Sequence, residues 1–356
     1  MAINLQPPAA SEIEISLFGP GTGECIVAHL GDNEWMVVDS CTAYNTGQPV
    51  ALKYLAELGV DPGQVKLIVI THFHDDHTAG MSILVDACSK AEIYISGALT
   101  HEESIAFVLA HAMDDVLSDR HKPSTYELAK LLKSVGDRHV RFVTENLVLY
   151  RKDGLEINAL SPSARAVTQS RASFAASLLE AETNFRKLAN KLHPNLCAIA
   201  LHICNGSDTI LLGSDLEVSS DPALGWTAVL QNKIRPTTTA KLFKVPHHGS
   251  QNGHCDKVVA SMLKEKPLSI LTTFNRSSLP RAADLARIKG YSSELYHTTP
   301  PKVKSSFPNR SRAVEESIAQ VVKSRRVVTG YIGHIQVRIV SGVCIVCHNE
   351  HASVAA

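Results

Sequence analysis

Short apolar runs that are followed at once by polar side chains dominate the pattern of this sequence. Residues 65–70 form such a run, rich in valine and isoleucine, which is typical of a buried β-strand. Similar runs occur at residues 35–38, 209–212 and 242–245. Amphipathic helical spacing occurs at residues 50–60, 81–88 and 281–289. The alternation of strands and helices predicts an α/β fold with helices layered on its sheets.

Helical patterns dominate the middle of the chain, from residue 97 to residue 192. They predict a mainly helical insertion in the α/β domain. Two short stretches of β-type residues, at 140–143 and 155–160, interrupt the insertion. We interpret them as a pair of strands.

Strand patterns return in the second half of the chain. The apolar run at 196–203, broken only by His202, predicts a strand. Residues 331–347 alternate around a Ser-Gly turn and predict a closing β-hairpin. Because no internal repeat or low-complexity segment divides the chain, we interpret residues 1–356 as one domain.

The composition excludes several classes of protein. Hydrophobic residues make up 44% and charged residues 20%, which are ordinary values for a globular protein. Lysine plus arginine equals aspartate plus glutamate, at 35 each, so no general field attracts nucleic acid or a membrane surface. No apolar run reaches the length of a membrane span, and the first residues lack the pattern of a secretory leader. We therefore expect a cytoplasmic protein that does not bind membranes.

Eight cysteines are scattered singly and are expected to be buried thiols of a reducing compartment. One grouping, Cys344-Ile-Val-Cys347-His348, matches the attachment pattern of a c-type haem, and with His351 it could form a zinc cluster. Haem attachment normally accompanies export, and this segment also alternates as a strand does. We therefore interpret it as the last strand of the hairpin.

Four side chains of metal-ligand type follow the strand at 65–70. They are His72, His74, Asp76 and His77, and zinc, manganese and iron accept imidazole and carboxylate ligands. His72 and His74 are two residues apart and project to the same side of an extended segment. Asp76 and His77 are adjacent and must lie on a turn to converge on a second point. The spacing therefore favours two metal ions over one.

Two other apolar strands end in side chains of the same type: Asp215 follows one, and His247 and His248 follow the other. The ends of strands at one edge of an α/β sheet are where sites are built. A carboxylate such as Asp215 can bridge two cations that share one water, which lowers the pKa of that water and supplies hydroxide at neutral pH. Asp39, at a further strand end, is either a carboxylate that orients one histidine or a turn residue.

These motifs resemble those of the metallo-β-lactamase fold hydrolase superfamily, in the branch that contains the hydrolase domain of the DNA-uptake competence protein. The resemblance extends over nearly the whole chain. It rests on the glycine-containing strand break at 17–24, the loop at 71–80, Gly213-Ser214-Asp215 and His247-His248-Gly249-Ser250. The last of these runs is the most specific to the branch. The resemblance implies a four-layer αββα sandwich and a metal-dependent hydrolase.

The resemblance also implies a set of metal ligands. His72 and His74 would bind the first metal ion, and Asp76 and His77 would bind the second. Asp215 would bridge the two ions. The ions would be zinc, with manganese as the alternative.

One of His247 and His248 would complete the second metal site, and the other would contact the substrate or the leaving group. The sequence leaves the assignment open. As a working hypothesis, His247 is a metal ligand and His248 is catalytic.

The chain departs from the family pattern at two places. The superfamily often supplies a third histidine to the first metal ion, and only His193 and Asn195 are candidates for this position. The branch also tends to carry a histidine after the strand at 268–274, where this chain has none. Arg276 and Arg281 are candidate anion contacts there.

Two metal ions flanking a hydroxide suit displacement at phosphorus as well as attack on an ester or lactone carbonyl. The branch resemblance favours a phosphodiester, in a nucleic acid or a nucleotide. The stretch from residue 302 to residue 326 agrees with this, because it contains seven basic residues and only two acidic ones. The basic residues are Lys302, Lys304, Arg310, Arg312, Lys323, Arg325 and Arg326. A solvated loop is the alternative interpretation of that stretch.

Two other functions stay open. One is a carboxylic-ester or lactone hydrolase on the same scaffold. The other is a regulatory module with a vestigial metal site, which would bind a protein partner through the helical insertion at 97–192.

Overall fold

The computed structural model describes most of the chain. The described residues are 1–43, 46–98, 130–131, 133–136, 138–180, 194–206, 208–301, 311–321 and 331–355. Of the insertion expected at 97–192, the structure therefore describes the last helical residues before 136 and the segment from 138 to 180. The sequence pattern at 102–118 lies outside the described residues.

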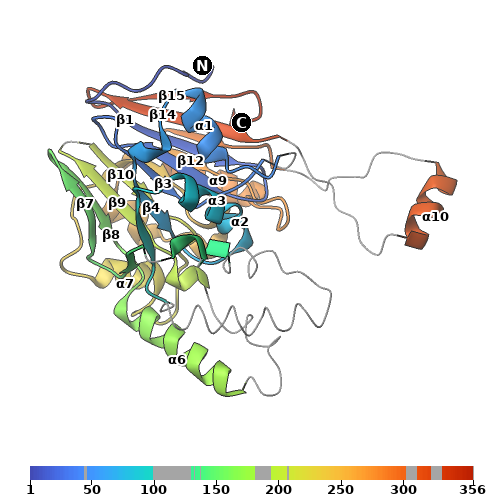
Figure 1. The fold of residues 1–356 in the computed structure, drawn as a ribbon. Helices are drawn as coiled ribbons and strands as arrows, with labels where there is room; N and C mark the ends of the chain where they lie inside the picture. The colour runs from blue at the N-terminus through green and yellow to red at the C-terminus, as the bar shows by residue number, and fades with distance from the viewer. Residues whose placement is uncertain are drawn as a thin grey trace.

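Two eight-stranded sheets form the centre of the molecule (Figure 1). The first sheet has the spatial order β15 (Val343–His348), β14 (Gly333–Val340), β1 (Ile13–Gly19), β2 (Cys25–His29), β3 (Trp35–Val38), β4 (Val65–Ile70), β5 (Glu92–Ser96) and β6 (Val140–Val143). Its strands from β3 to β6 are parallel, and the others are antiparallel. The strand expected at 65–70 is therefore central and carries the candidate metal loop at its carboxyl end.

The second sheet repeats this arrangement. Its order is β16 (Ser353–Val354), β13 (Glu294–His297), β12 (Leu263–Leu271), β11 (Ala240–Lys244), β10 (Asp208–Leu212), β9 (Leu201–Asn205), β8 (Leu155–Ala159) and β7 (Val148–Lys152). The strands from β10 to β13 are parallel, and the remaining pairs are antiparallel. Polar residues that follow parallel strands are thereby brought to one edge in each sheet.

Helices cover the outer face of each sheet, and this confirms the four-layer αββα sandwich. One apolar core lies between the sheets, where Leu17 and Val69 of the first sheet and Leu242 of the second are buried. Two further cores lie under the helices. The first sheet is covered by α1 (Val50–Glu57) and α3 (Met81–Ala87). The second sheet is covered by α7 (Gly225–Gln231), α8 (Asp256–Met262) and α9 (Ala282–Tyr291).

The remaining helical segments lie at or beyond the edges of this sandwich. They are α2 (Asp75–Thr78), α6 (Ala164–Glu180), α10 (Arg312–Val321) and the short 3-10 turns η1 (Pro62–Gln64), η3 (Pro194–Cys197), η4 (His247–Gly249) and η5 (Gln251–Gly253). In Figure 1, α6 lies along one edge of the sandwich and α10 lies away from both sheets. No helix within the described ranges is both long and apolar enough to cross a membrane.

Two local expectations from the sequence are wrong. The stretches at 140–143 and 155–160 do not pair: β6 joins β5 in the first sheet, and β8 pairs with β7 in the second. Asp153 and Gly154 have φ of 49° and 88°, which suits the tight turn between β7 and β8. Short runs encode the strand conformation but not the sheet that a strand joins.

The apolar run at 196–203 is only partly a strand. Its first residues belong to η3, and β9 begins at Leu201. Between them the backbone connects the two sheets, because Ile199 N–H donates to Thr71 O and Leu160 N–H donates to Ala200 O. The run is apolar because it is buried in this crossing, not because it is a regular strand.

Candidate metal centre

The loop after β4 folds back against the ends of two neighbouring strands. The backbone N–H of Glu24 donates to Asp76 O at 2.8 Å, and Ser40 N–H donates to His77 O at 2.8 Å. Gly80 ends the loop with φ of 75°, and a Cβ at this position would lie 2.6 Å from the Thr42 side chain. Only glycine meets both conditions without strain. The sequence therefore fixes the loop at both of its ends.

Four of the expected ligands converge at the edge shared by the two sheets. One ligand atom each from Asp76, His77, Asp215 and His248 can be chosen so that all lie within 4.8 Å of one another. Asp215 Oδ2 lies 3.5 Å from both His77 Nε2 and His248 Nε2. Asp76 Oδ2 lies 3.2 Å from His248 Nε2. All four side chains are at least nine-tenths buried.

The other two histidines of the loop lie beside this group. His72 Nε2 is 3.1 Å from His74 Nδ1, and the His72 ring is 4.3 Å from the His77 ring between centroids. Two ring nitrogens therefore lie close together beside the group, and a second metal position at these two histidines stays a prediction.

The chemistry of this group fits divalent cations. His77 Nε2 and Asp215 Oδ1 are buried and form no hydrogen bond, which is costly for polar atoms unless a ligand occupies the site. Burial raises the pKa of Asp215, but the neighbouring His248, His77 and Lys244 outweigh it and hold the pKa well below its usual value. Burial, together with His77 and His74, holds the pKa of His72 well below its usual value. Anionic carboxylate and neutral imidazole are the forms that bind metal ions.

Hydrogen bonds on the outer side of the histidines direct their lone pairs into the group. His77 Nδ1 donates to Asp39 Oδ2 at 2.6 Å, so its Nε2 faces Asp215. Thr71 Oγ1 also donates to Asp39 and lies 2.9 Å from His72 Nδ1. Because that hydroxyl proton is used on Asp39, His72 Nδ1–H donates to the hydroxyl and Nε2 carries the lone pair. The expectation that Asp39 orients a histidine is confirmed.

A protein-family model matches the part of the chain that contains the first ligand candidates. Residues 18–132 match the model of the metallo-β-lactamase superfamily. The matched part contains the loop from His72 to His77, whereas Asp215 and His248 lie beyond it. The match supports the superfamily, and the competence-protein branch stays a prediction. The search of curated proteins found no significant match.

Solved structures of metallo-β-lactamase proteins align with the chain at low identity. The metallo-β-lactamase fold protein YhfI from Bacillus subtilis has 14% identity and a TM-score of 0.39, over 83% of this chain and 98% of its own. The metallo-β-lactamase SMB-1 has 13% identity and a TM-score of 0.35, over 75% and 82% of the two chains. The class B3 di-zinc metallo-β-lactamase LRA-12 from an Alaskan soil metagenome has 12% identity and a TM-score of 0.31, over 55% of this chain and 58% of its own. These identities carry no information on the substrate of this chain.

His247 is not part of the group formed by the other ligand candidates. Its ring lies 6.2 Å from that of His248 between centroids, and its Nδ1 is 3.1 Å from Glu217 Oε1. His247 and His248 have φ of 47° and 50°, and these left-handed conformations direct the two side chains apart. Asp39 and Ser214 also have positive φ. Such strain costs about 1–3 kcal/mol per residue and gathers at functional sites.

Asn195, a candidate for the third ligand of the first metal ion, lies beside His247. Its Nδ2 donates to Glu217 Oε1 at 2.9 Å and is 3.4 Å from His247 Nε2, while its Oδ1 is buried without a partner. Glu217 also accepts from Asn252. The other candidate for this ligand, His193, lies outside the described residues.

Sequence reasoning missed the charged and polar residues that support the site. Glu217 stands two residues after Asp215, and its spacing carries no motif. Lys244 could have been noticed, because a charged residue inside an apolar strand is rarely buried without a partner. Glu24 ends the 17–24 motif of the resemblance, but no role for it follows from the sequence, and Thr272 gave no signal. The roles of both residues depend on contacts between the two sheets.

Other candidates from the sequence lie apart from this site. Among the described residues, neither group of converging ligand atoms includes Cys344, Cys347 or His348, and all eight cysteines are free. Arg276 is exposed, and Arg281 is the N-cap residue of α9, where its backbone N–H donates to Asp284 Oδ2 at 3.0 Å. Of the seven basic residues between 302 and 326, only Arg312 is described, and it pairs with Glu316.

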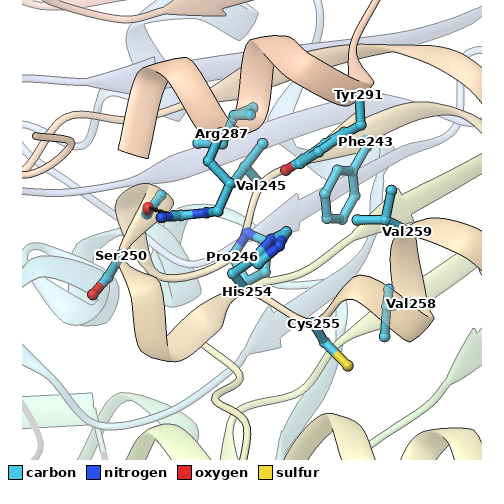
Figure 2. Close-up of a pocket in the computed structure, with 12 residues that line it drawn as sticks. Phe243, Val245, Pro246, Ser250, His254, Cys255, Val258, Val259, Arg287 and Tyr291 are labelled. Atoms are coloured by element: carbon cyan, nitrogen blue, oxygen red, sulfur yellow. Dashed lines mark hydrogen bonds between the residues drawn. The ribbon is translucent and has the colours of Figure 1, made fainter. Parts of the chain in front are cut away.

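A small pocket lies behind the His247–Ser250 loop, on the outer side of the second sheet. Figure 2 shows Arg287 and Tyr291 of α9 on one side of it, with His254 below them. Arg287 donates to Gly249 O at 2.7 Å and to Gln251 Oε1 at 2.5 Å. The pocket therefore belongs to the packing that holds the strained loop in place, and none of the metal-ligand candidates lines it.

Proposed function

We propose that this protein is a hydrolase that uses two divalent cations. The observation that carries the proposal is the convergence of Asp76, His77, Asp215 and His248 at one buried point, beside the paired ring nitrogens of His72 and His74. When bound, two divalent cations polarise a scissile bond and lower the pKa of water enough to supply hydroxide near neutral pH. Zinc suits this set of imidazole and carboxylate ligands, and manganese is the alternative.

Each residue has a role in this proposal. Asp76, His77 and His248 would hold one cation, and His72 and His74 would hold the other. Asp215 would bridge them. Asp39 orients His77 and, through Thr71, fixes the lone pair of His72.

We assign the metal-binding role of the His-His pair to His248 and the substrate-contacting role to His247, the reverse of the working hypothesis from the sequence. The distances of His248 to Asp76 and Asp215 support this assignment. His247 lies at the side of the group and is held by Glu217, so its ring could contact a substrate or a leaving group.

A phosphodiester is the substrate class that we propose. The His-His-Gly-Ser run supports it through the branch resemblance. The position of His247 is compatible with it, because an imidazole beside a cation site can donate a hydrogen bond to a phosphoryl oxygen. An ester or lactone would use the same donor for its developing oxyanion, so the choice of a phosphodiester rests on the branch resemblance.

The first test is the metal content by elemental analysis, together with hydrolysis of bis(p-nitrophenyl) phosphate with and without chelator. We expect two metal ions per chain and turnover that chelator abolishes. If the protein binds two metal ions but hydrolyses only esters or lactones, the proposed substrate class changes from a phosphodiester to a carbonyl compound. A protein that takes up no metal would contradict the hydrolase proposal and favour the partner-binding module.

Substitution of the shared ligands gives a second test. Asp215→Ala and His77→Ala should each lose bound metal and lower hydrolysis at least about 100-fold, because each removes a ligand atom from the buried group. Asp208→Ala is the matched control, since it lies at the opposite end of β10 and pairs with Lys241. Full activity of either ligand variant would contradict the mechanism.

A further inference from the structure

A buried ion pair lies directly behind the candidate metal centre. Lys244, in β11, has no solvent exposure, and its Nζ lies 2.5 Å from Glu24 Oε1. Glu24 is 2% exposed and follows the glycine-rich break before β2. A buried ammonium group needs a partner, because its desolvation is otherwise uncompensated. The pair therefore joins the two sheets at the edge where the ligands converge.

The ammonium group of Lys244 is close to a metal-ligand candidate. It donates to Ser214 O at 3.0 Å and lies 4.0 Å from Asp215 Oδ1. Asp215 Oδ1 itself forms no hydrogen bond. Glu24 is thus the nearer of two carboxylates that could pair with this lysine, and Asp215 is the other.

The second oxygen of Glu24 reaches another ligand candidate. Thr272 Oγ1 donates to Glu24 Oε2, and the same hydroxyl lies 2.9 Å from His248 Nδ1. Because the hydroxyl proton is used on Glu24, His248 Nδ1–H donates to the hydroxyl oxygen. The His248 lone pair is then on Nε2, which faces Asp76 and Asp215.

This is the arrangement of Asp39, Thr71 and His72 repeated with a threonine and a histidine of the second sheet and a carboxylate of the first. In both cases a buried carboxylate accepts from a threonine, and the threonine accepts from a histidine Nδ1. The carboxylate–threonine unit fixes the tautomer that presents Nε2 to a metal ion.

We propose that Glu24 is a positioning residue for the candidate metal centre. One of its oxygens holds the Lys244 ammonium away from Asp215, and the other fixes the His248 tautomer through Thr272. This inference depends on the proposed metal centre. Without Glu24, Asp215 is the nearest remaining carboxylate for Lys244, so the lysine competes with a metal ion for it.

The test is the affinity of metal-free protein for zinc, measured by competition with a chromophoric chelator. Glu24→Gln should weaken the tighter zinc site about 10–100-fold, the range for lost supporting hydrogen bonds. The double variant with Lys244→Met and Glu24→Gln should regain most of the lost zinc affinity, because no ammonium then competes for Asp215. The absorption bands of bound cobalt should differ between Glu24→Gln and the wild type, which a purely structural role would not require.

Matched controls come from a second ion pair that also involves β11, between Lys241 of β11 and Asp208 of β10. Asp208→Asn and Lys241→Met should leave zinc affinity unchanged. If Glu24→Gln does not fold, Thr272→Val keeps the Glu24–Lys244 pair, removes the hydroxyl that links Glu24 to His248, and should weaken zinc binding by itself.

The outcomes separate the two proposals. A wild type that binds no zinc overturns both the metal centre and the role of Glu24. A wild type that binds zinc, with Glu24→Gln and Thr272→Val equal to it, overturns only the role of Glu24. A double variant as weak as Glu24→Gln shows that competition by Lys244 is not the cause and overturns that part of the proposal.

Discussion

The orientation of single imidazole rings decides what the candidate metal centre can bind. His77, His72 and His248 each use Nδ1 on an outer hydrogen bond and present Nε2 to the group. His74 presents Nδ1 instead, 3.1 Å from His72 Nε2. A neutral histidine has one N–H and one lone pair, so the outer partner selects the ligand atom. Chemistry at this site therefore depends on residues that never contact a metal ion.

The two adjacent histidines should separate in their effects. His248→Ala should lose the tighter metal ion and lower kcat/KM at least about 100-fold, because it removes a ligand atom from the buried group. His247→Ala should keep both metal ions, because its ring lies apart from them, and should raise KM or lower kcat. Elemental analysis and steady-state kinetics on the same preparations measure both effects.

The reverse result, with metal lost from His247→Ala and retained by His248→Ala, would restore the assignment made from the sequence. Asn252→Ala is a useful control near this loop, since it removes one hydrogen bond to Glu217 and no ligand candidate.

Individual ligands could be predicted from the sequence where a motif is local. His72, His74, Asp76 and His77 lie within six residues of one another, and a strand end places them together. The different orientations of His247 and His248 could not be predicted, because they depend on two left-handed residues whose φ values no local pattern encodes. Residues such as Glu24 act across the interface of two sheets and are invisible without the fold.

At the scale of elements, paired glycines let the two sheets approach each other near the site. Gly19 of β1 is opposite Gly333 of β14, and both lie against Thr298, which follows β13. A Cβ on Gly333 would lie 1.4 Å from Thr298 O, a backbone atom that cannot move alone. The end of the second sheet is thus pressed against the first at a place where no side chain fits.

Gly333→Ala should destabilise the protein by about 3 kcal/mol, the upper part of the range for overpacking, because the backbone of β14 or of residue 298 must shift. Urea unfolding followed by circular dichroism measures the change. The control is Gly290→Ala in α9, where a Cβ meets nothing within 4 Å. It should stabilise the protein by about 0.5–1 kcal/mol, as expected for alanine in a helix. Equal stability of Gly333→Ala and the wild type would contradict this account.

Elements were predictable where their own sequence determines them. The strands that precede the ligands and the helices at α1, α3 and α9 follow from periodicity alone. The pairing partners of strands could not be predicted, as β6 and β8 show, because a run of four or five β-type residues carries no information on which sheet it joins. The segment at 198–200 reads as a strand since burial, not hydrogen-bond pattern, sets its composition.

At the scale of the whole molecule, a buried polar layer lies on the outer face of the first sheet. His334 is stacked on Phe18 at 4.1 Å between centroids, and its Nε2 lies 3.0 Å from Ser16 Oγ. Arg338 donates to Glu14 and to the carbonyl oxygen of Gln6, which ties the N-terminal segment to β14. Neutral His334 is accommodated there, whereas burial disfavours the charged form of its imidazole.

Protein stability should therefore fall with acidification. Burial lowers the pKa of His334 from 6.5 to about 3, so the unfolded chain binds this proton first as the pH falls. The contribution of neutral His334 to the free energy of unfolding is fully present above pH 6.5. It is lost as the pH falls from 6.5 towards 3, at up to about 1.4 kcal/mol per pH unit. Urea unfolding at pH 7 and pH 5 measures it. His334→Phe should lose less stability over this interval than the wild type, and equal losses would contradict the assignment.

The pairing of β1 with β14 also has a consequence for biosynthesis. Residues Ile13 to Gly19 of β1 pair with Ile339 to Gly333 of β14. During synthesis, one edge of β1 therefore stays unpaired until β14 has been made, more than three hundred residues later. At about 5–20 residues per second, that wait is on the order of 15–60 s on the ribosome. An unpaired strand edge is a template for aggregation. Nascent chains that stop before β14 should therefore require chaperones, and premature termination should yield aggregates in place of a partly folded protein.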